Sequence, residues 1–562
     1  MAYFHGIKSS ELPTKLVPSA EISAGLIFCV GTSPIHLATN PAPPNKPVLV
    51  YELSEYVEQF GYDGDFDSYT NDELASSQFQ LFSVSPAVFV NVLNPAKHFN
   101  KVEAELGGVC ESSITIPAAM FLDTLEVKSK GEETEISLTE GTDYTAEVIT
   151  SDDGDYTKID IKVDATLPSD DLKISYTLNE NSVEVDRSVS ELPFELPVGA
   201  SNIAVKAVTT PVNILNMDED YTAAYNSDGE VVFSLLDATK VFGDKVQITY
   251  HEAAPEKVTK SDIIGGYNSV TGEYTGLELV EQIFPRFRMP VGIILAPKFS
   301  EDVTVAAVMK AKCVGINSVF NAIALCDIPT SEVKNYTEVP EYKNKKNLLD
   351  TSLVVCYPKV SLGGVQYHLS TQLASLMNQV DAVQGNDMPY ISPSNKNLQM
   401  DKSVLEDGSE MFLTLDQANY LNSQGIVTAL NFANGWVLWG NRTSLFGSGG
   451  STDPKDTFIS VRRTMYYLRN QLILTYWSKV DSPMNRRLIE SFLDSVQIYF
   501  NGLKAREIIL GGEISFREKD NPTTDLIDGK IVFHVEFTPP VPAENISFEC
   551  EFQPDYFSTL FE

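Results

Sequence analysis

The C-terminal region of the chain contains FISVRRTMYYLRNQLILTYWSKVDSPMNRRLIESFLDSVQIYFNG at residues 458–502, a sequence that predicts two helices. Apolar residues recur every three or four positions over 458–476, which is the period of a helix with one buried face. A second apolar stripe ends at Phe500. Ser482 and Pro483 are suitable as its N-cap and first helical position, and Gly502 is a suitable end. We therefore predict two amphipathic helices at the start of this region.

Two strands are predicted after these helices, joined by a proline-rich link. Apolar residues alternate with other residues over 531–537 and again over 546–552. Between them, PPVP at 539–542 forces an extended backbone. Such a link can carry a final strand to the sheet edge of a neighbouring chain. An ordinary C-terminal hairpin fits the same pattern, and the pattern alone leaves both possibilities open.

Upstream, short apolar runs alternate with helical patterns. The predicted strands are 26–30, 87–92, 291–297 (running into a turn), 320–327 and 352–358, and the predicted helices are 51–60, 301–313 and 370–380. Alternating strands and helices are typical of a sheet with helices on its faces. Together with the C-terminal region, this pattern predicts a multidomain protein of the α+β/α/β class.

The character of the sequence changes at about Gly107. Residues 110–260 contain about 30 acidic against 11 basic residues, with strand patterning and many Asp and Gly turns. Four short segments also return after roughly 75 residues. The matching pairs are 125–128 with 203–206, 143–146 with 220–223, 164–166 with 237–239, and 172–176 with 246–250. We expect two tandem β-sandwich-like modules, 107–182 and 183–258, inserted into a surface loop of the α/β domain.

Composition restricts the possible functions. The chain has 562 residues, 43% of them hydrophobic and 10% aromatic, as expected for several globular domains. Its net charge of −36 argues against nucleic acid or an anionic membrane as a direct partner, because both would repel it. The first ten residues lack a signal-peptide pattern, and no apolar run approaches the roughly 20 residues of a membrane span. We expect synthesis and assembly in the cytoplasm.

No catalytic or metal-binding motif is evident in the sequence. The six cysteines and six histidines are scattered, without CxxC or zinc-ligand spacing, and neither GxSxG nor a phosphate-binding loop is present. The acidic turn at 152–155 is oxygen-rich, but its spacing is not that of an EF-hand and favours a solvated turn. Asp327 and Asp381 are interpreted as cap or turn residues. We predict no enzymatic activity, no cofactor and no metal.

Basic residues gather in the predicted C-terminal helices, against the acidic background. They are Arg462, Arg463, Arg469, Lys479, Arg486 and Arg487, and only Asp481 is acidic within this stretch. One interpretation is that these side chains pair with the many carboxylates of the same chain, which contributes little at a surface. The other is a basic surface that meets a second molecule.

Several segments resemble the phage contractile-tail sheath proteins. In the C-terminal region they are FISVRR (458–463), NPTTDLIDG (521–529) and PAENISF (542–548); upstream they are IIGGYNSVTGEYTGL (263–277), Asp381, MPYISPSN (388–395), LNSQGI (421–426) and WGNRT (439–443). Val427 and Asn441 depart from the commoner residues of the family, asparagine and alanine. The resemblance lies in the order of these segments along roughly 300 residues.

The resemblance implies a discontinuous sheath core domain, 21–106 and 259–454, with the β modules decorating the outside of a tube. Residues 455–562 would form a C-terminal sheath domain with tube-facing helices and a strand arm. Residues 1–20, which are polar and proline-spaced, would be an N-terminal arm. Strands would be exchanged between subunits through Phe4, Ile7, Ile546, Phe548, Cys550 and Phe552. The tube or a neighbouring subunit would be contacted by Arg462, Arg463, Arg469, Arg486 and Arg487.

The function implied by the resemblance is mechanical. Such a subunit polymerises helically, in hexameric rings, around a tail tube and contracts to drive the tube through the host cell envelope. Its partners would be further copies, the tail tube protein, and the baseplate and tail terminator proteins, with no direct nucleic acid and no membrane insertion. Its location would be a virion tail or a phage-tail-like particle assembled in the host cytoplasm.

Two other functions fit parts of the sequence. The β modules suit a secreted or surface glycan-binding protein, which the missing signal pattern disfavours. The α/β pattern suits a hydrolase with a β insertion, which the missing nucleophile motif disfavours.

Overall fold

The computed structural model describes residues 25–561 with short gaps. The residues outside the description are 1–24, 111, 131–133, 151–156, 164–170, 179, 189–190, 192–193, 197–199, 210–211, 227–228, 242–243, 386, 434, 448, 450 and 562. The expected N-terminal arm with Phe4 and Ile7, and the whole acidic turn at 152–155, therefore lie outside the described residues. The chain divides into two compact units, one of Met1–His98 with Pro255–Glu562 and one of Phe99–Ala254.

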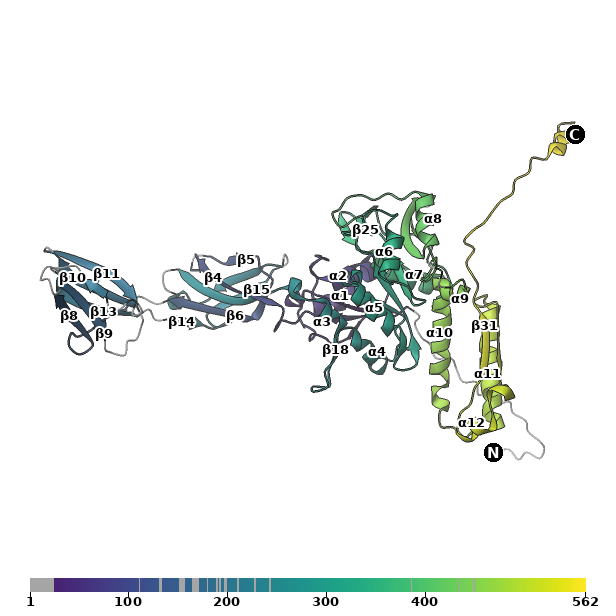
Figure 1. Ribbon diagram of the computed structural model, residues 1–562, viewed down its shortest axis with the longest axis horizontal. Coiled ribbons are helices and arrows are strands. Elements are labelled where there is room, and N and C mark those ends of the chain that lie inside the picture. Colours follow the sequence, from purple (N-terminus) through teal and green to yellow (C-terminus); the bar gives the residue numbers. More distant parts are fainter. Residues whose placement is uncertain are drawn as a thin grey trace, which may run out of the picture. The chain divides into compact units, whose positions relative to one another are not determined.

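An eight-stranded sheet organises the first unit (Figure 1). Its order is β2-β3-β1-β20-β23-β24-β28-β29, with parallel pairing from β3 to β28 and an antiparallel strand at each edge. The bounds are Ile27–Gly31 (β1), Val48–Val50 (β2), Ala87–Asn91 (β3), Ile293–Leu295 (β20), Ile323–Asp327 (β23), Leu353–Cys356 (β24), Ile426–Phe432 (β28) and Gly435–Trp439 (β29). Every residue of β1, β3, β20, β23 and β24 is buried, as expected for strands covered on both faces.

Helices surround this sheet where the apolar periodicity predicted them. The three predicted helices are confirmed as α1 (Leu53–Phe60), α5 (Val303–Lys312) and α7 (Leu369–Val383). Both α5 and α7 pack against β23. The remaining helical segments of the unit before the C-terminal region are η1 (Ile35–Leu37), α2 (Thr70–Ala75), η2 (Ser76–Leu81), η5 (Pro255–Lys257), α3 (Lys260–Ile264), η6 (Gly276–Leu279), α4 (Val280–Phe287), η7 (Phe299–Glu301), α6 (Val339–Lys345) and α8 (Leu415–Ser423).

Short strands form small sheets beside the main one. They are β18 (Gly266–Tyr267) with β19 (Tyr274–Thr275), β21 (Val314–Ile316) with β22 (Phe320–Asn321), and β25 (Lys359–Leu362) with β26 (Val365–Tyr367) and β27 (Lys402–Val404). The predicted strand 320–327 is therefore two strands in different sheets, β22 and β23, because Ala322 turns back to donate its backbone N–H to Cys313.

Two long helices dominate the C-terminal region. They are α10 (Ile459–Tyr476) and α11 (Arg486–Ala505), preceded by α9 (Pro454–Thr457). The predicted start of α11 at Ser482 and Pro483 is wrong, because the Asn485 side chain accepts from the Leu488 N–H at 2.9 Å and caps the helix there. The predicted end at Gly502 is also wrong, since the helix runs through it.

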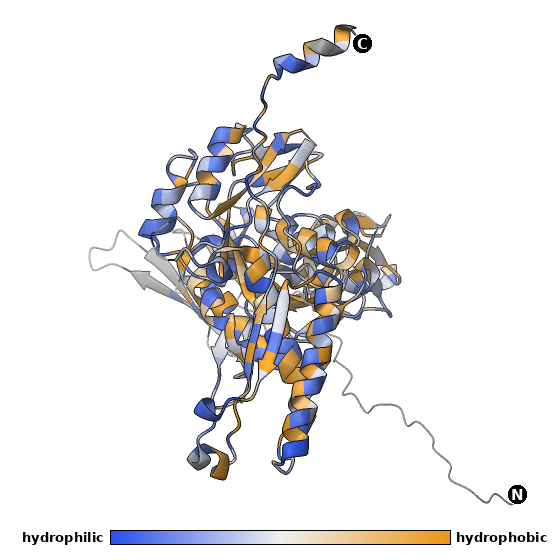
Figure 2. Cartoon of the chain, turned by 90° about the vertical axis from the view of Figure 1, so that its right-hand side faces the viewer, coloured by the Kyte–Doolittle hydropathy of each residue, from blue (hydrophilic) through white to orange (hydrophobic). Residues whose placement is uncertain are grey.

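A second apolar core holds this region together. Side chains of α10 and α11 pack with a two-stranded antiparallel sheet, β30 (Gly511–Ser515) and β31 (His534–Thr538). Figure 2, coloured by hydropathy, shows helices that carry both hydrophilic and hydrophobic residues. The short segments between are η8 (Trp477–Lys479), η9 (Glu518–Asp520) and α12 (Thr523–Ile527). The predicted strand 531–537 is confirmed in part, as β31.

The second unit contains two β-sandwiches with separate apolar cores. We call them sandwich A and sandwich B. Sandwich A has sheets β14-β6-β17-β4 and β15-β16-β5, and sandwich B has sheets β11-β10-β13-β7 and β12-β9-β8. The bounds in A are Phe99–Gly107 (β4), Ile114–Ile116 (β5), Met120–Lys130 (β6), Val212–Leu215 (β14), Tyr221–Tyr225 (β15), Val231–Leu235 (β16) and Lys245–Ala253 (β17), with η4 (Ala238–Lys240); those in B are Thr134–Ser137 (β7), Tyr144–Thr150 (β8), Thr157–Val163 (β9), Asp171–Leu178 (β10), Asn181–Ser188 (β11), Phe194–Leu196 (β12) and Ser201–Thr209 (β13).

The expected tandem arrangement of modules 107–182 and 183–258 is wrong. Sandwich B is formed entirely by strands between β6 and β14, whereas sandwich A takes strands from both ends of the unit. The expected boundary after residue 182 falls inside β11, which pairs with β10 along its whole length. The outer limits also differ, since β4 begins at Phe99 and pairs with β17, whose last residue is Ala253.

Candidate functional site

The chain beyond β31 forms a segment, residues 539–553, which we call the C-terminal arm. Its first residue, Pro539, is buried, and every residue from Ala543 to Gln553 is exposed. The arm contains no helix or strand before the short helix η10 (Pro554–Phe561), as Figure 1 shows. The exposed fractions are 70% for Ile546, 87% for Phe548 and 76% for Phe552, and Cys550 is exposed. The sequence predicted a strand at 546–552; the structure corrects this, because within the described chain the segment has no ladder partner. Contiguous exposed apolar residues of this kind mark an interaction site.

The root of the arm is fixed by Arg442, which follows β29. Its Nε donates to Oε1 of Glu544 at 2.9 Å, and its second guanidinium nitrogen donates to Oε2 at 2.5 Å. The remaining nitrogen donates to the Thr457 hydroxyl at 3.1 Å. The guanidinium also lies over the Phe458 ring, 3.5 Å from its centroid, and over the Phe446 ring at 4.1 Å. Bidentate pairing with stacking fixes the direction of both side chains, so the arm leaves the body at a defined point.

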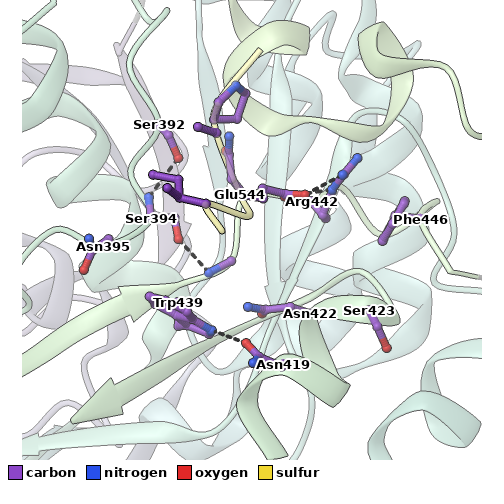
Figure 3. A pocket seen from close by; sticks show the side chains of 15 residues that line it. Ser392, Ser394, Asn395, Asn419, Asn422, Ser423, Trp439, Arg442, Phe446 and Glu544 are labelled. Atoms are coloured by element: carbon purple, nitrogen blue, oxygen red, sulfur yellow. Dashed lines mark hydrogen bonds and ion pairs between the residues drawn. The ribbon is translucent and has the colours of Figure 1, made fainter. Parts of the chain in front are cut away.

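A cavity of about 600 Å³ surrounds this root. Figure 3 shows polar side chains around it, and the Trp439 indole N–H donates to Asn419 Oδ1 at 2.9 Å on one side. Ser394 accepts from the Gly440 backbone N–H at 3.0 Å on the other. Arm residues Pro542 to Ile546 supply part of the lining. The cavity is thus formed where the arm passes over the body.

The small sheet beside the C-terminal helices has two free edges. Strands β30 and β31 pair with each other from Gly511 opposite Thr538 to Ser515 opposite His534. Among the described residues no third strand pairs with either of them. A two-stranded sheet is marginally stable alone, and free edges are templates for strands from other chains.

The basic residues of the C-terminal helices do not form one surface. Arg463 is 4% exposed and makes a double ion pair with Asp381 of α7, at 3.2 Å and 2.5 Å. This burial excludes Arg463 from the expected contact surface of this chain. Burial raises the pKa of Asp381, and the Arg463 charge acts in the opposite direction. Arg462 is largely buried and pairs with Asp456.

The other basic residues lie at the surface. The Arg486 side chain is 91% exposed and its Nε donates to Glu490 Oε1 one helical turn later, at 2.7 Å. Arg469 and Arg487 are also exposed, whereas Lys479 is half-buried. Of the basic residues predicted to form a contact surface, those that are exposed are therefore Arg469, Arg486 and Arg487.

The two aspartates singled out in the sequence are buried among structural partners. Asp327, at the end of β23, accepts from the Ser370 N–H at 3.1 Å and from the Ser370 hydroxyl, which holds the first turn of α7. Burial raises the pKa of Asp327 to about 6. Both aspartates thus hold helices in place, and Asp381 does so through Arg463.

Other sequence-based expectations concern cysteines, metals and membranes. Cys29, Cys313, Cys326 and Cys356 are buried free thiols, and Cys110 is exposed. In the part of the chain that the structure describes, no cluster of His, Cys, Asp or Glu is arranged to hold a metal ion. Of the helices described, none combines the length and apolarity needed to cross a bilayer.

Comparison with known proteins finds similarity to tail sheath proteins. The model of the phage tail sheath C-terminal domain matches residues 451–553. The chain is 28% identical over 323 residues to the tail sheath protein of Burkholderia phage BcepMu, covering 56% of this chain and 65% of that protein. It is 26% identical over 319 residues to the tail sheath protein of Escherichia phage P2, covering 54% and 73%.

One match among solved structures is the helical sheath of the anti-feeding prophage in its contracted state. It has a TM-score of 0.47 and 12% identity, covering 98% of this chain and 99% of that one. The matched domain includes α10, α11, both strands of the small sheet and the C-terminal arm. The chain is thus similar to phage tail sheath proteins, and its C-terminal residues match the model of their C-terminal domain.

The contact between Arg442 and Glu544 was not predicted from the sequence, although both residues lie in the family segments WGNRT and PAENISF. The two residues are about a hundred positions apart and pair only once the chain is folded. Their opposite charges were a signal, but opposite charges alone do not identify which residues pair.

Proposed function

We propose that this chain is a structural subunit of a contractile tail sheath, which polymerises helically around a tail tube. On contraction the array drives the tube through a cell envelope. The observation that carries the proposal is the C-terminal arm, an apolar, strand-free segment anchored at its root beside a sheet with two free edges. Strand addition to a free edge would bury these side chains and satisfy the backbone of both partners.

The dimensions of the arm suit this role. The residues after the anchor, 545–553, would span roughly 30 Å when extended, since a strand rises about 3.3 Å per residue. Ile546, Phe548 and Phe552 would then lie on one face of the added strand, because successive side chains alternate. The residues beyond the Glu544 anchor pair with no strand of the described chain, so they could change direction while their hydrogen bonds to the neighbour persist. A tether of this kind holds subunits together through a change of packing.

Other roles in the proposal follow the family. The first unit would form the sheath core, and Phe99–Ala254 would be decoration on the outside of the tube. Arg469, Arg486 and Arg487 would contact the tube or a neighbouring subunit. The partners would be further copies in hexameric rings, the tail tube protein, and the baseplate and terminator proteins. The subunit would act mechanically, without catalysis, in a virion tail or a phage-tail-like particle.

Truncation after Pro542 tests the proposal. The truncated chain keeps the body of both units and loses the anchor residue Glu544 and the exposed apolar side chains. We expect a folded protein that forms no hollow striated cylinders in negative-stain micrographs, while the full chain forms them. The matched control is full-length Glu549→Gln, which leaves the apolar face of the arm unchanged and should assemble. Regular cylinders from the truncated chain would contradict the proposal.

The tube contact has a separate test. Charge reversal with Arg486→Glu and Arg487→Glu should weaken assembly on added tail tubes and leave the fold unchanged, since both side chains are exposed. Assembly on tubes at the level of the unchanged chain would remove these residues from the contact. Arg469→Glu, on the other helix, shows whether the contact extends to α10.

A further inference from the structure

The two sandwiches of the inserted unit have the same strand arrangement, although they are built from different parts of the chain. The matching sequence segments divide the unit into a first repeat, strands β4 to β10, and a second repeat, strands β11 to β17. Sandwich A combines β4 to β6 of the first repeat with β14 to β17 of the second. Sandwich B combines β7 to β10 of the first with β11 to β13 of the second.

The sheet orders agree strand by strand once the repeats are aligned. The sheet β14-β6-β17-β4 of A corresponds to β7-β13-β10-β11 of B, and β15-β16-β5 corresponds to β8-β9-β12. The matching sequence segments identify the same partners. They place β6 with β13, β8 with β15, and β10 with β17.

Residue pairing agrees as well. In sandwich B, Ile174 is paired with Val205, and in sandwich A the equivalent Ile248 is paired with Val127. The ladder of β10 with β13 has an irregularity after Ser175, and the ladder of β17 with β6 has one after Thr249, the equivalent position. A bulge at the same place in both ladders is unexpected for two unrelated sheets, because bulges are specific local features.

Hydrogen bonds of two equivalent tyrosines cross between the repeats. The Tyr144 hydroxyl of the first repeat donates to the Ile203 carbonyl of the second, at 3.0 Å. The Tyr221 hydroxyl of the second repeat donates to the Leu125 carbonyl of the first, at 3.5 Å. Both tyrosines are 2% exposed, and each lies in the core of its own sandwich. The same contact is thus made twice, each time between repeats and in opposite directions.

The turns before these tyrosines are also equivalent. Asp143 accepts from the Thr139 N–H at 2.8 Å, and Asp220 accepts from the Asn216 N–H at 2.8 Å. In each turn an isolated β-bridge also joins an earlier residue to the tyrosine that follows, Glu140 to Tyr144 in one and Met217 to Tyr221 in the other. The agreement therefore extends from sheet order to single side chains.

We propose that residues 99–178 and 181–253 are two copies of one seven-strand module that have exchanged their last four strands. Insertion of an unrelated domain between β6 and β14 accounts for the position of sandwich B. It does not explain why sandwich B has strands equivalent to those of sandwich A but in a permuted chain order, or why both sandwiches share the bulge and the tyrosine contact. Exchange within a tandem pair produces all of these, because each strand keeps its place in the module and only changes its partner repeat.

The exchange makes the inserted unit a device with two alternative strand pairings. Each sandwich is complete only when both repeats are present, and the chain passes between the sandwiches twice, from β6 to β7 and from β13 to β14. A single repeat nevertheless contains one strand of every kind. If the other repeat is removed, β10 can take the place of β17 between β4 and β6, with Ile174 opposite Val127.

Two reciprocal deletions in the full-length chain test this. Deletion of residues 179–252 joins Leu178 to Ala253 and leaves only the first repeat, and deletion of residues 99–179 joins His98 to Glu180 and leaves only the second. The control deletes residues 131–211, which removes sandwich B. It joins Lys130 to Val212, which are directly paired, through an Asn-Gly turn.

Amide hydrogen exchange read by mass spectrometry follows the remaining strands. We expect the first-repeat variant to retain slow exchange in β4 and β6, on the order of 100-fold slower than an unstructured chain, as in the control. The second-repeat variant should retain it in β15 to β17. Protection in either reciprocal variant supports the proposal. Loss of protection in both, with the control still protected, overturns it, because an unexchanged module could then not form from one repeat.

Discussion

The buried sheet of the first unit and the C-terminal arm differ in which side chains they bury and which they expose. In the sheet and its helices, charged residues are buried with partners from distant segments, such as Arg463 with Asp381. In the arm, Phe548 and its apolar neighbours face solvent and the backbone pairs with no strand among the described residues. The sheet is completed by its own chain. In the proposed strand exchange, the arm would be completed by another chain.

This difference predicts how substitutions divide. A change in the buried sheet or its helices should reduce the free energy of unfolding, because the contact it removes exists in the single chain. A change in the arm should leave the free energy of unfolding unaltered and prevent assembly, because the contact it removes exists only between chains. If substitutions in the two regions affected the free energy of unfolding and assembly in the same way, this distinction would be wrong.

The largest loss of stability is expected from Arg463→Ala. The substitution leaves Asp381 buried without its partner, which costs about 3–5 kcal/mol when a buried ion pair is broken from one side. Chemical denaturation of the unassembled protein measures the change. Arg469→Ala is the matched control, since it is exposed on the same helix and should change stability by less than about 0.5 kcal/mol. Equal effects of the two would contradict the buried role of Arg463.

A smaller loss is expected from Lys343→Met. Lys343 is fully buried in α6 and donates to the carbonyls of Gln424, Ser444 and Phe446. Burial lowers its pKa to about 8. Methionine fills similar space but leaves the carbonyls unpaired, at an expected cost of about 2–3 kcal/mol. Lys345→Met, exposed on the same helix, serves as the control, and a loss below about 1 kcal/mol for Lys343→Met would show that water replaces the amine.

Stability should also depend on pH through Asp72 in α2. Burial raises the pKa of Asp72 to about 7, although the Tyr56 hydroxyl donates to it at 2.7 Å and the Asp63 N–H at 2.9 Å. Because the folded-state pKa lies above the unfolded value of 3.8, the protonated group stabilises the fold at low pH. This contribution is lost as pH rises from about 4 to about 7, with a slope of at most about 1.4 kcal/mol per pH unit.

The measurement compares slopes rather than absolute stabilities. Asp72→Asn cannot titrate and should flatten the decline of unfolding free energy between pH 4 and pH 7. Asp67→Asn, which changes an exposed carboxylate, should leave the slope as it is. An unchanged slope in Asp72→Asn would mean that another group dominates this pH range.

Sequence patterns predicted the elements better than the contacts between them. The strands and helices of the main sheet follow from apolar runs and periodicity, which are local properties of the chain. The start of α11 was misplaced because Ser482 with Pro483 and Asn485 are both good start signals. The Asn485 side chain forms the capping bond, and no local rule ranks the two.

Long-range pairing was the part that the sequence could not supply. The repeat was visible in the sequence. A repeat is equally compatible with separate modules and with exchanged ones, because each strand lies beside equivalent strands in either arrangement. The basic cluster was likewise visible. Its division into buried Arg463 and exposed Arg486 depends on which helix face meets α7, which is decided by packing.

The smallest effect on stability is expected from Phe548→Asp, in the arm. Phe548 is 87% exposed and contributes no packing to the single chain, so the free energy of unfolding should change by less than about 0.5 kcal/mol. Assembly should fail, because an added strand that carries this side chain against a neighbour's apolar surface would bury an unpaired charge. Glu549→Gln is the control. Its side chain lies on the opposite face of an extended strand, so cylinders should still form in electron micrographs. If Phe548→Asp assembled as well as Glu549→Gln, the arm would not be completed by a neighbouring chain, and its exposed apolar face would require a different partner.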